Sequence, residues 1–255
     1  MKRLTRYAAA MTISTIAVIG TPAQAQQPPA DDATRYAALG DSVAAGFKAQ
    51  PATNGYTYLL YQNGAFDRLS HTLFNNLSSV GATSEDVLLY QVPQVLIPSI
   101  EGGFQPDYVT LTVGGNDAAA IQRFAATNPS PLHLQLFIQQ TINGYAQNLG
   151  GILLALTTAL PDVTIFVGNH YSVPEVEALL PGADLVLAAF NQTVQAVAAP
   201  FAGRVHVVDV YSAFLDRQGL LLIDRRGASL FEVHLTNAGH RVMAKAFADS
   251  IAENK

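Results

Sequence analysis

The sequence predicts an α/β protein, a single-domain three-layer α/β/α sandwich whose central parallel sheet has about five strands. Short apolar runs, typical of strands buried on both faces, alternate with longer segments whose apolar residues recur at helical spacing. This alternation is typical of a parallel sheet covered by helices on both faces. Without the first 25 residues, which are discussed next, about 230 residues remain, and a chain of this length can bury one sizeable core.

Residues 1–25 are expected to be a signal peptide. They begin with three basic residues, continue with an uncharged and mainly apolar run at 8–20, and end in Ala23-Gln24-Ala25. The apolar run falls short of the ~20 residues that a membrane-spanning helix needs. We therefore expect a secreted or periplasmic protein without stable membrane insertion, with a flexible lead-in at 26–33 and one domain at 34–255.

Charge and cysteine content exclude several classes of function. Removing the signal peptide takes away three basic and no acidic residues, which changes the net charge from −5 to −8. No basic patch remains to attract nucleic acid, and we expect a monomer without such a partner. The chain has no cysteine, which excludes disulfides, Cys-based zinc sites and thiol catalysis.

Strands and helices are predicted from the apolar patterns along the chain. The predicted strands are residues 36–39, 71–77 (the weakest pattern), 108–113, 163–167 and 205–210. The predicted helices are residues 145–156 before Pro161, 187–197 before Pro200, and 236–251, whose inner face carries Val242, Met243, Ala246 and Phe247. The apolar insert at 118–143 lines an acyl pocket, covers it, or is simply a packed helix; the pattern leaves these open.

Ser42 follows the first predicted strand through Gly40 and Asp41. Ligand sites of such sheets lie at the carboxyl ends of the strands, and a backbone N–H at the start of a helix can bind an anion. For the triplet taken alone, a helix N-cap is the better explanation. Asp41 and Asp117 are interpreted as structural cap or turn residues.

Two further segments carry groups suited to acyl transfer. Gly114-Gly115-Asn116-Asp117 follows the third strand, and an Asn amide is a neutral donor for a developing oxyanion. His234 precedes the last helix, and its imidazole can accept the proton of a serine hydroxyl. Of the other histidines, His170 follows the fourth strand and is a second candidate for the base, and His206 is expected in the core. The remaining three are expected at surface or helix positions: His71, His133 and His240.

These segments together resemble the SGNH, or GDSL-type, lipase and esterase family, which is named for Ser, Gly, Asn and His in four blocks. The matching residues, in family order, are Gly40-Asp41-Ser42, Gly81, Gly114-Gly115-Asn116-Asp117, and His234 with Asn237-Ala238-Gly239. The resemblance implies a flavodoxin-like SGNH hydrolase fold and a secreted carboxylic ester hydrolase. It implies Ser42 as nucleophile, His234 as general base and acid, and an oxyanion hole of Ser42, Gly81 and Asn116, with no metal or organic cofactor.

The sequence departs from the family pattern at the acid. Family members usually carry Asp three residues before the histidine, where this chain has Phe231. Glu232 lies two residues before His234, and an extended backbone would place both on the same side. Either Glu232 or a backbone carbonyl orients the imidazole, and a slight preference goes to Glu232 because a carboxylate stabilises an imidazolium better.

Other functions remain to be distinguished. The expected substrate is a small-molecule ester or lipid, and a carbohydrate acetylesterase of the same family is the alternative. A non-catalytic flavodoxin-like ligand-binding module would not need His234 or Asn116. An α/β-hydrolase is disfavoured because Gly40-Asp-Ser-Val-Ala44 lacks the final glycine of Gly-x-Ser-x-Gly.

Overall fold

The computed structural model of the protein describes residues 32–226 and 229–255, and the side chains of residues 224–232 lie outside that description. The predicted signal peptide and most of the predicted lead-in also lie outside the described residues, so both stay predictions.

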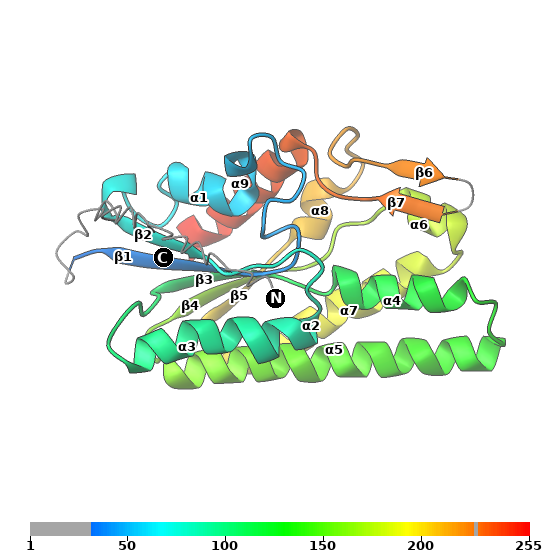
Figure 1. The fold of residues 1–255 in the computed structure, drawn as a ribbon, viewed down its shortest axis with the longest axis horizontal. Helices are drawn as coiled ribbons and strands as arrows, with labels where there is room; N and C mark the ends of the chain where they lie inside the picture. The colour runs from blue at the N-terminus through cyan, green and yellow to red at the C-terminus, as the bar shows by residue number, and fades with distance from the viewer. Residues whose placement is uncertain (1–31, 227–228) are drawn as a thin grey trace, which may run out of the picture.

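Five parallel strands form one sheet in the order β2–β1–β3–β4–β5 (Figure 1). The strands are β1 (Thr34–Gly40), β2 (Thr72–Asn76), β3 (Tyr108–Thr112), β4 (Thr164–Gly168) and β5 (Val205–Val208). All five predicted strands are confirmed, including the weakest. Successive connections lead from β1 to one side of the sheet (β2) and then to the other side (β3, β4 and β5), so the strand order reverses between β1 and β3. Ligands bind at such a switch point in open parallel sheets.

Helices cover both faces of the sheet, so the predicted three-layer architecture is confirmed (Figure 1). One layer contains α1 (Tyr56–Gln62), α8 (Val210–Phe214) and α9 (Asn237–Glu253). The other contains α3 (Val92–Ile100), α5 (Pro131–Ala159) and α7 (Ala183–Ala198), with α2 (Ser84–Asp86) and α4 (Gly115–Ala125) beside them.

Shorter elements complete the chain. The short helices are η1 (Ala52–Asn54), η2 (Leu69–His71), the π-type turn η3 (Val87–Gln91), α6 (Pro174–Leu179) and η4 (Ala199–Phe201). A hairpin that the sequence did not predict, β6 (Asp224–Arg226) and β7 (Ser229–Glu232), lies above α6 in Figure 1.

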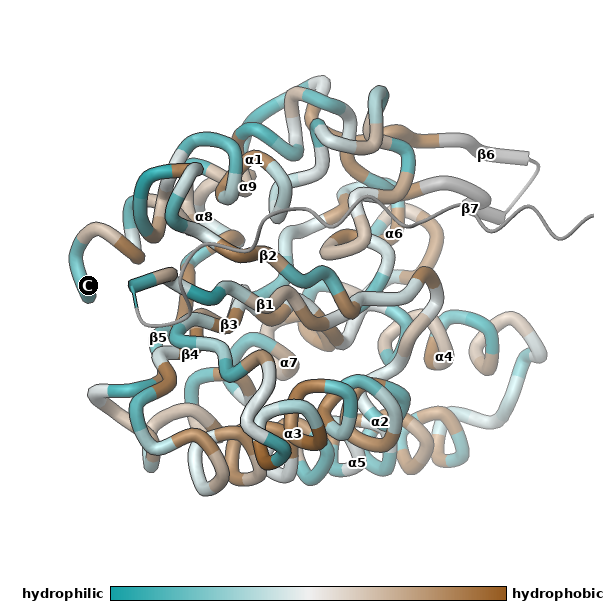
Figure 2. Tube along the Cα trace, turned by 60° about the vertical axis from the view of Figure 1, so that its left-hand side comes forward, coloured by the Kyte–Doolittle hydropathy of each residue, from teal (hydrophilic) through white to brown (hydrophobic). Residues whose placement is uncertain are grey.

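Strand β1 shows how the sheet builds a core on each face. Ala37 and Leu39 belong to the hydrophobic cluster that the sheet forms with α3, α5 and α7. Tyr36 and Ala38 belong to a second hydrophobic cluster, on the opposite face, which the sheet forms with α1 and α9. All four side chains are fully buried because alternate residues of a strand point to opposite faces. Figure 2 shows the matching hydrophobic stretches on the helices, most continuously on α3.

The three predicted helices are confirmed as parts of α5, α7 and α9. The insert at 118–143 forms most of α4 and the first part of α5, so it is largely helical, and Ala118 and Ile121 of α4 also line a pocket. Helix α5 carries no Asp, Glu, Lys or Arg over its 29 residues. Even so, no helix in the described part of the chain is long and apolar enough to cross a membrane.

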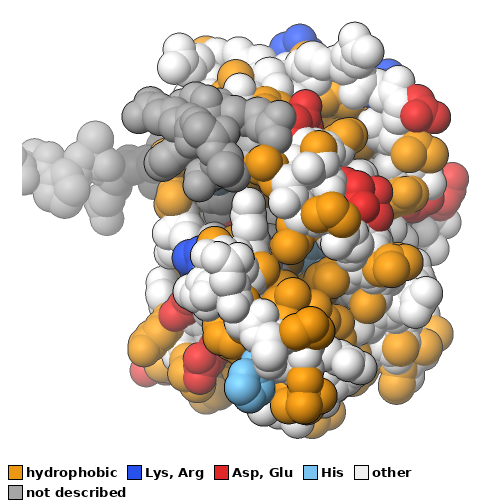
Figure 3. All heavy atoms as spheres, turned by 90° about the vertical axis from the view of Figure 1, so that its right-hand side faces the viewer, with side chains coloured by type: hydrophobic (Ala, Val, Ile, Leu, Met, Phe, Trp, Pro, Cys, Tyr) orange, Lys and Arg blue, Asp and Glu red, His pale blue; other side chains and the backbone are white. Residues whose placement is uncertain are grey.

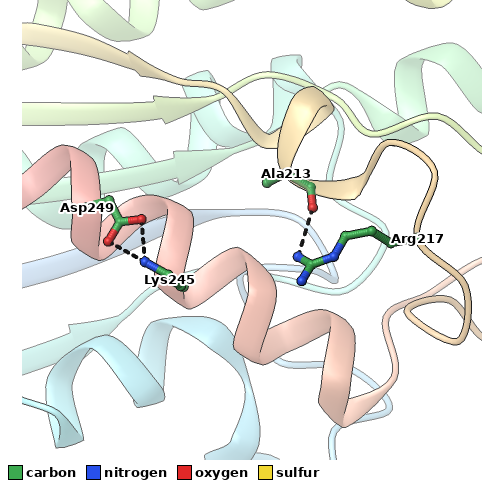
Figure 4. A network of polar contacts seen from close by, with 4 residues as sticks. All are labelled: Ala213, Arg217, Lys245 and Asp249. Carbon is green, nitrogen blue, oxygen red and sulfur yellow. Dashed lines mark hydrogen bonds and ion pairs between the residues drawn. The ribbon is translucent and has the colours of Figure 1, made fainter.

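Helix α9 and the end of α8 carry ordinary surface contacts. Lys245 Nζ binds Asp249 at 2.7 Å across one helical turn, and the Arg217 guanidinium donates to the Ala213 carbonyl at 3.2 Å (Figure 4). Both members of the ion pair are exposed, at 75% and 58%. Such a pair adds little stability, so the fold depends on its two cores.

Gly40 ends β1 at a point where the backbone of β3 comes very close. Its φ is +132°, and a Cβ at this position would lie only 2.1 Å from the Thr112 carbonyl oxygen. Only glycine combines this φ with such an approach. The position of the Ser42 turn therefore depends on the absence of a side chain at Gly40.

We expect Gly40→Ala to lower the free energy of unfolding by roughly 2–4 kcal/mol, because it adds backbone strain and a clash with β3. Gly102→Ala is the matched control, since Gly102 also has a positive φ but a Cβ added there would meet no atom within 4 Å. It should lose only about 1 kcal/mol. Urea unfolding measures both, and equal losses would contradict the role of the close approach.

Candidate active site

Ser42 lies in the turn that leaves β1, and only 6% of it is exposed. The turn is held to β3 by the Asp41 N–H, which donates to the Thr112 carbonyl at 3.0 Å. The expected start of a helix after Ser42 is wrong. The Phe47 N–H reaches back five residues to the Ser42 carbonyl at 2.9 Å, and successive turns follow instead of a regular helix.

His234 faces Ser42 from the opposite end of the sequence. Its Nε2 lies 2.8 Å from Ser42 Oγ, a hydrogen bond that spans 192 residues. The edge of the imidazole contacts Phe47, with ring centroids 4.8 Å apart. The His234 carbonyl accepts the Leu222 N–H at 2.6 Å, so backbone and ring are both held.

Asn116 is held to the Gly81 loop through Ala82, the residue after Gly81. Asn116 lies in the first turn of α4, and its side-chain amide donates to the Ala82 carbonyl at 2.9 Å. The next residue, Asp117, accepts the Ser84 N–H at 3.0 Å and the Ser84 hydroxyl at 2.6 Å. These contacts join the start of α4 to the Gly81 loop and give Asp117 the structural role predicted for it.

Several N–H groups at the site are available to a ligand. Within the described part of the chain, the backbone N–H groups of Ser42 and Gly81 have no hydrogen-bond acceptor. The Asn116 amide carries two N–H groups, and the contact with Ala82 uses one of them. The structure thus places Ser42, Gly81 and His234 on loops and Asn116 in the first turn of α4, with Ser42 paired to His234 and Asn116 to the Gly81 loop.

Glu232 ends β7, two residues before His234. Its side chain lies outside the described residues, so its suggested role in orienting the imidazole stays a prediction.

Gln91 is a residue that the sequence prediction missed. It is 2% exposed, and its amide makes two hydrogen bonds to Gly40, accepting the N–H at 2.7 Å and donating to the carbonyl at 2.8 Å. A buried amide must be hydrogen-bonded, and the apolar run at 87–97 contains two glutamines, Gln91 and Gln94, of which only Gln91 is buried. Its partner could not be read from the sequence.

His170 does not pair with Ser42. Its Nδ1 lies 3.1 Å from Asn191 Oδ1, and its Nε2 lies 3.1 Å from the Val113 carbonyl. Burial lowers the pKa of His170, while the two oxygens and nearby Asp117 oppose the shift. The ring packs against Gly114, where a Cβ would lie 2.4 Å from Nε2, so His170 supports the loop that leads to Asn116.

The other histidines are mostly where they were expected. His71 is in η2, and His133 is exposed on α5. His206 lies on β5 and stacks on Phe166 at 5.4 Å, but it is only partly buried because β5 is at the edge of the sheet, so its expected place in the core is wrong. His240 is on helix α9 but is completely buried, and its Nδ1 accepts the Tyr56 N–H at 3.3 Å. Burial, together with nearby His234, lowers the pKa of His240 to about 4.

Asp41 is a buried acid beneath the nucleophile. Its Oδ1 accepts the Val43 N–H at 2.9 Å, which is the turn role predicted for it. Burial raises the pKa of Asp41 to about 7; the Val43 hydrogen bond opposes this, and Asp117 adds to it. Among the described residues no group of His and acidic side chains is arranged to hold a metal ion.

Comparisons with known proteins identify a family and a shared fold. The model of the GDSL-like Lipase/Acylhydrolase family matches residues 38–242. A phospholipase A1 from Streptomyces albidoflavus NA297 is 17% identical with a TM-score of 0.64, covering 88% of this chain and 100% of its own. A lipase from a goat rumen metagenome is 17% identical with a TM-score of 0.63, covering 85% and 97%.

A further solved structure, a catalytic mutant of an acetylxylan esterase from Geobacillus stearothermophilus, is 19% identical with a TM-score of 0.60, covering 86% of this chain and 94% of its own. At these identities the structures show a shared fold. No curated protein sequence matches the chain.

The raised pKa of Asp41 makes stability depend on pH. Between its ordinary value of 3.8 and about 7 the folded protein binds the proton more tightly than the unfolded chain. The contribution of Asp41 to the free energy of unfolding is therefore fully present below pH 4 and falls as the pH rises to about 7. We expect Asp41→Asn, which keeps the acceptor for Val43, to flatten this slope in urea-unfolding series; equal slopes for the two proteins would contradict it.

Proposed function

Because the chain belongs to the GDSL-like lipase/acylhydrolase family, we propose that it hydrolyses carboxylic esters with Ser42 as the nucleophile and His234 as the base. The observation that carries the proposal is the 2.8 Å contact between Ser42 Oγ and His234 Nε2. A serine hydroxyl becomes an effective nucleophile when a base accepts its proton within hydrogen-bond reach. A module that only binds ligands would not require this pair.

In the proposed acylation step, Ser42 Oγ attacks the ester carbonyl carbon while its proton moves to His234 Nε2. The tetrahedral intermediate collapses when the carbon–oxygen ester bond breaks and the imidazolium returns the proton to the departing alkoxide, releasing the alcohol. Water then attacks the acyl-enzyme with the same base, and the carboxylic acid leaves.

The oxyanion of each intermediate is proposed to bind the N–H groups of Ser42 and Gly81 and one N–H of Asn116. The two backbone groups lack an acceptor in the described structure, and the Asn116 amide retains one N–H. Preformed donors stabilise the transition state because they need no reorganisation when charge develops. The contact between Asn116 and Ala82 would fix two of the three donors relative to each other.

Three contacts are proposed to orient His234. Phe47 contacts the ring edge, and the hydrogen bond to Leu222 holds the backbone. Glu232 remains the proposed acceptor for the second ring nitrogen. We also propose export from the cell, which rests on the signal-like residues 1–25.

We expect Ser42→Ala to lower kcat for p-nitrophenyl esters on the order of 10⁴–10⁶-fold, because the variant has no nucleophile to form an acyl-enzyme. A serine-reactive organophosphate should label the wild type and leave the variant unlabelled. Ser250→Ala, near the end of α9, is the matched control and should retain activity and labelling. Failure of the wild type to hydrolyse any ester would overturn the proposal.

We expect Asn116→Ala to lower kcat about 10²–10³-fold with little change in KM, because an oxyanion donor acts mainly in the transition state. Asn143→Ala on the exposed part of α5 is the control for an Asn truncation and should be silent. Steady-state kinetics and urea unfolding separate the two effects. An equal loss of kcat in both variants would remove Asn116 from the oxyanion hole.

A further inference from the structure

A cavity of about 220 Å³ lies at the carboxyl ends of β3 and β4 and borders the segments that carry Ser42, Asn116 and His234. Its wall includes Asp41 and Val43 on either side of Ser42, Gly115 next to Asn116, and Val233 next to His234. Any ester whose carbonyl lies at Ser42 would therefore have this cavity open to one of its two arms.

The cavity extends between α4 on one side and α6 and α7 on the other. Ala118 and Ile121 line it from α4, Val176 from α6, and Leu187 and Phe190 from α7. Figure 3 views this end of the molecule and shows hydrophobic side chains gathered around a hollow in its surface. These elements create an apolar channel bordered by regular helices.

Polar side chains in the wall are largely satisfied by the protein. Thr112 shares a hydrogen bond with Tyr56 at 3.2 Å, and the Asn169 amide binds Asp209 at 3.1 Å and the Tyr211 N–H at 2.8 Å. Both ring nitrogens of His170 face protein oxygens. A sugar bound here would lose hydrogen bonds to water without replacing them, whereas a hydrocarbon chain loses none.

The volume limits the length of such a chain. An apolar protein cavity of about 150 Å³ holds benzene, which has six carbons, so a cavity of 220 Å³ holds on the order of seven to nine carbons. Burying each one strengthens binding by about fourfold until the cavity is full.

We propose that this cavity binds the acyl chain of a straight-chain ester of medium length, about seven to nine carbons, and that Ala118 and Leu187 set the limit. The inference rests on the proposed function, since Ser42 must act on the carbonyl at the mouth of the cavity. Ala118 is a small residue on the α4 wall, where a larger side chain would project into the channel. Leu187 lines the channel from α7, and it is only partly buried, so its truncation opens space without removing a fully buried core residue.

The test is a series of p-nitrophenyl esters from acetate to palmitate. For the wild type, kcat/KM should rise about fourfold per methylene to a maximum near octanoate and stop rising beyond it. Ala118→Leu should move the maximum to shorter chains and lower kcat/KM for octanoate at least tenfold while sparing acetate. Leu187→Ala should move the maximum to longer chains, so the two variants shift it in opposite directions.

Ala126→Leu is the matched control, because Ala126 caps the same helix on the exposed side and lies outside the cavity wall. It should keep the wild-type profile. Ser42-dependent hydrolysis that is fastest with acetate, or a maximum that neither Ala118→Leu nor Leu187→Ala moves, would overturn the acyl-chain inference and leave the proposed function intact. No hydrolysis of any ester in the series would overturn both.

Discussion

The site depends on how closely β1 and β3 end beside each other. Gly40 lies against the Thr112 carbonyl, and the Asp41 N–H donates to that same oxygen at 3.0 Å. A single carbonyl at the end of β3 therefore sets the direction in which the chain leaves β1. Ser42 follows directly, and the order of the strands makes this edge the switch point where loops separate and leave space for a ligand.

Side-chain amides and carboxylates then connect the loops that carry the other groups. Gln91 binds both backbone groups of Gly40, Asn116 binds the Ala82 carbonyl, and Asp117 binds Ser84. Each of these bonds crosses from one loop or helix to another, so the loops keep fixed positions relative to the sheet. Such support allows hydrogen-bond donors to be in place before charge develops.

The same crowding removes water from around the site, with visible electrostatic effects. The pKa of buried Asp41 rises to about 7, and the pKa of buried His240 falls to about 4, because burial disfavours the charged form of each group. Asp41 is thus poorly suited to hold a permanent charge under Ser42. The apolar cavity beyond it continues this dry environment between α4 and α7.

The sequence by itself determined the layers, the strands and the four motif segments, because period, turn residues and short motifs are local properties of the chain. It could not show that the turn after Ser42 is irregular, since that conformation depends on packing against Phe47 and His234. Nor could it reveal that Gln91 holds Gly40 across 51 residues, that His170 supports Gly114, or that the insert at 118–143 lines a cavity with its first helix. Only the tertiary structure decided these points, because each depends on which distant groups share one small volume.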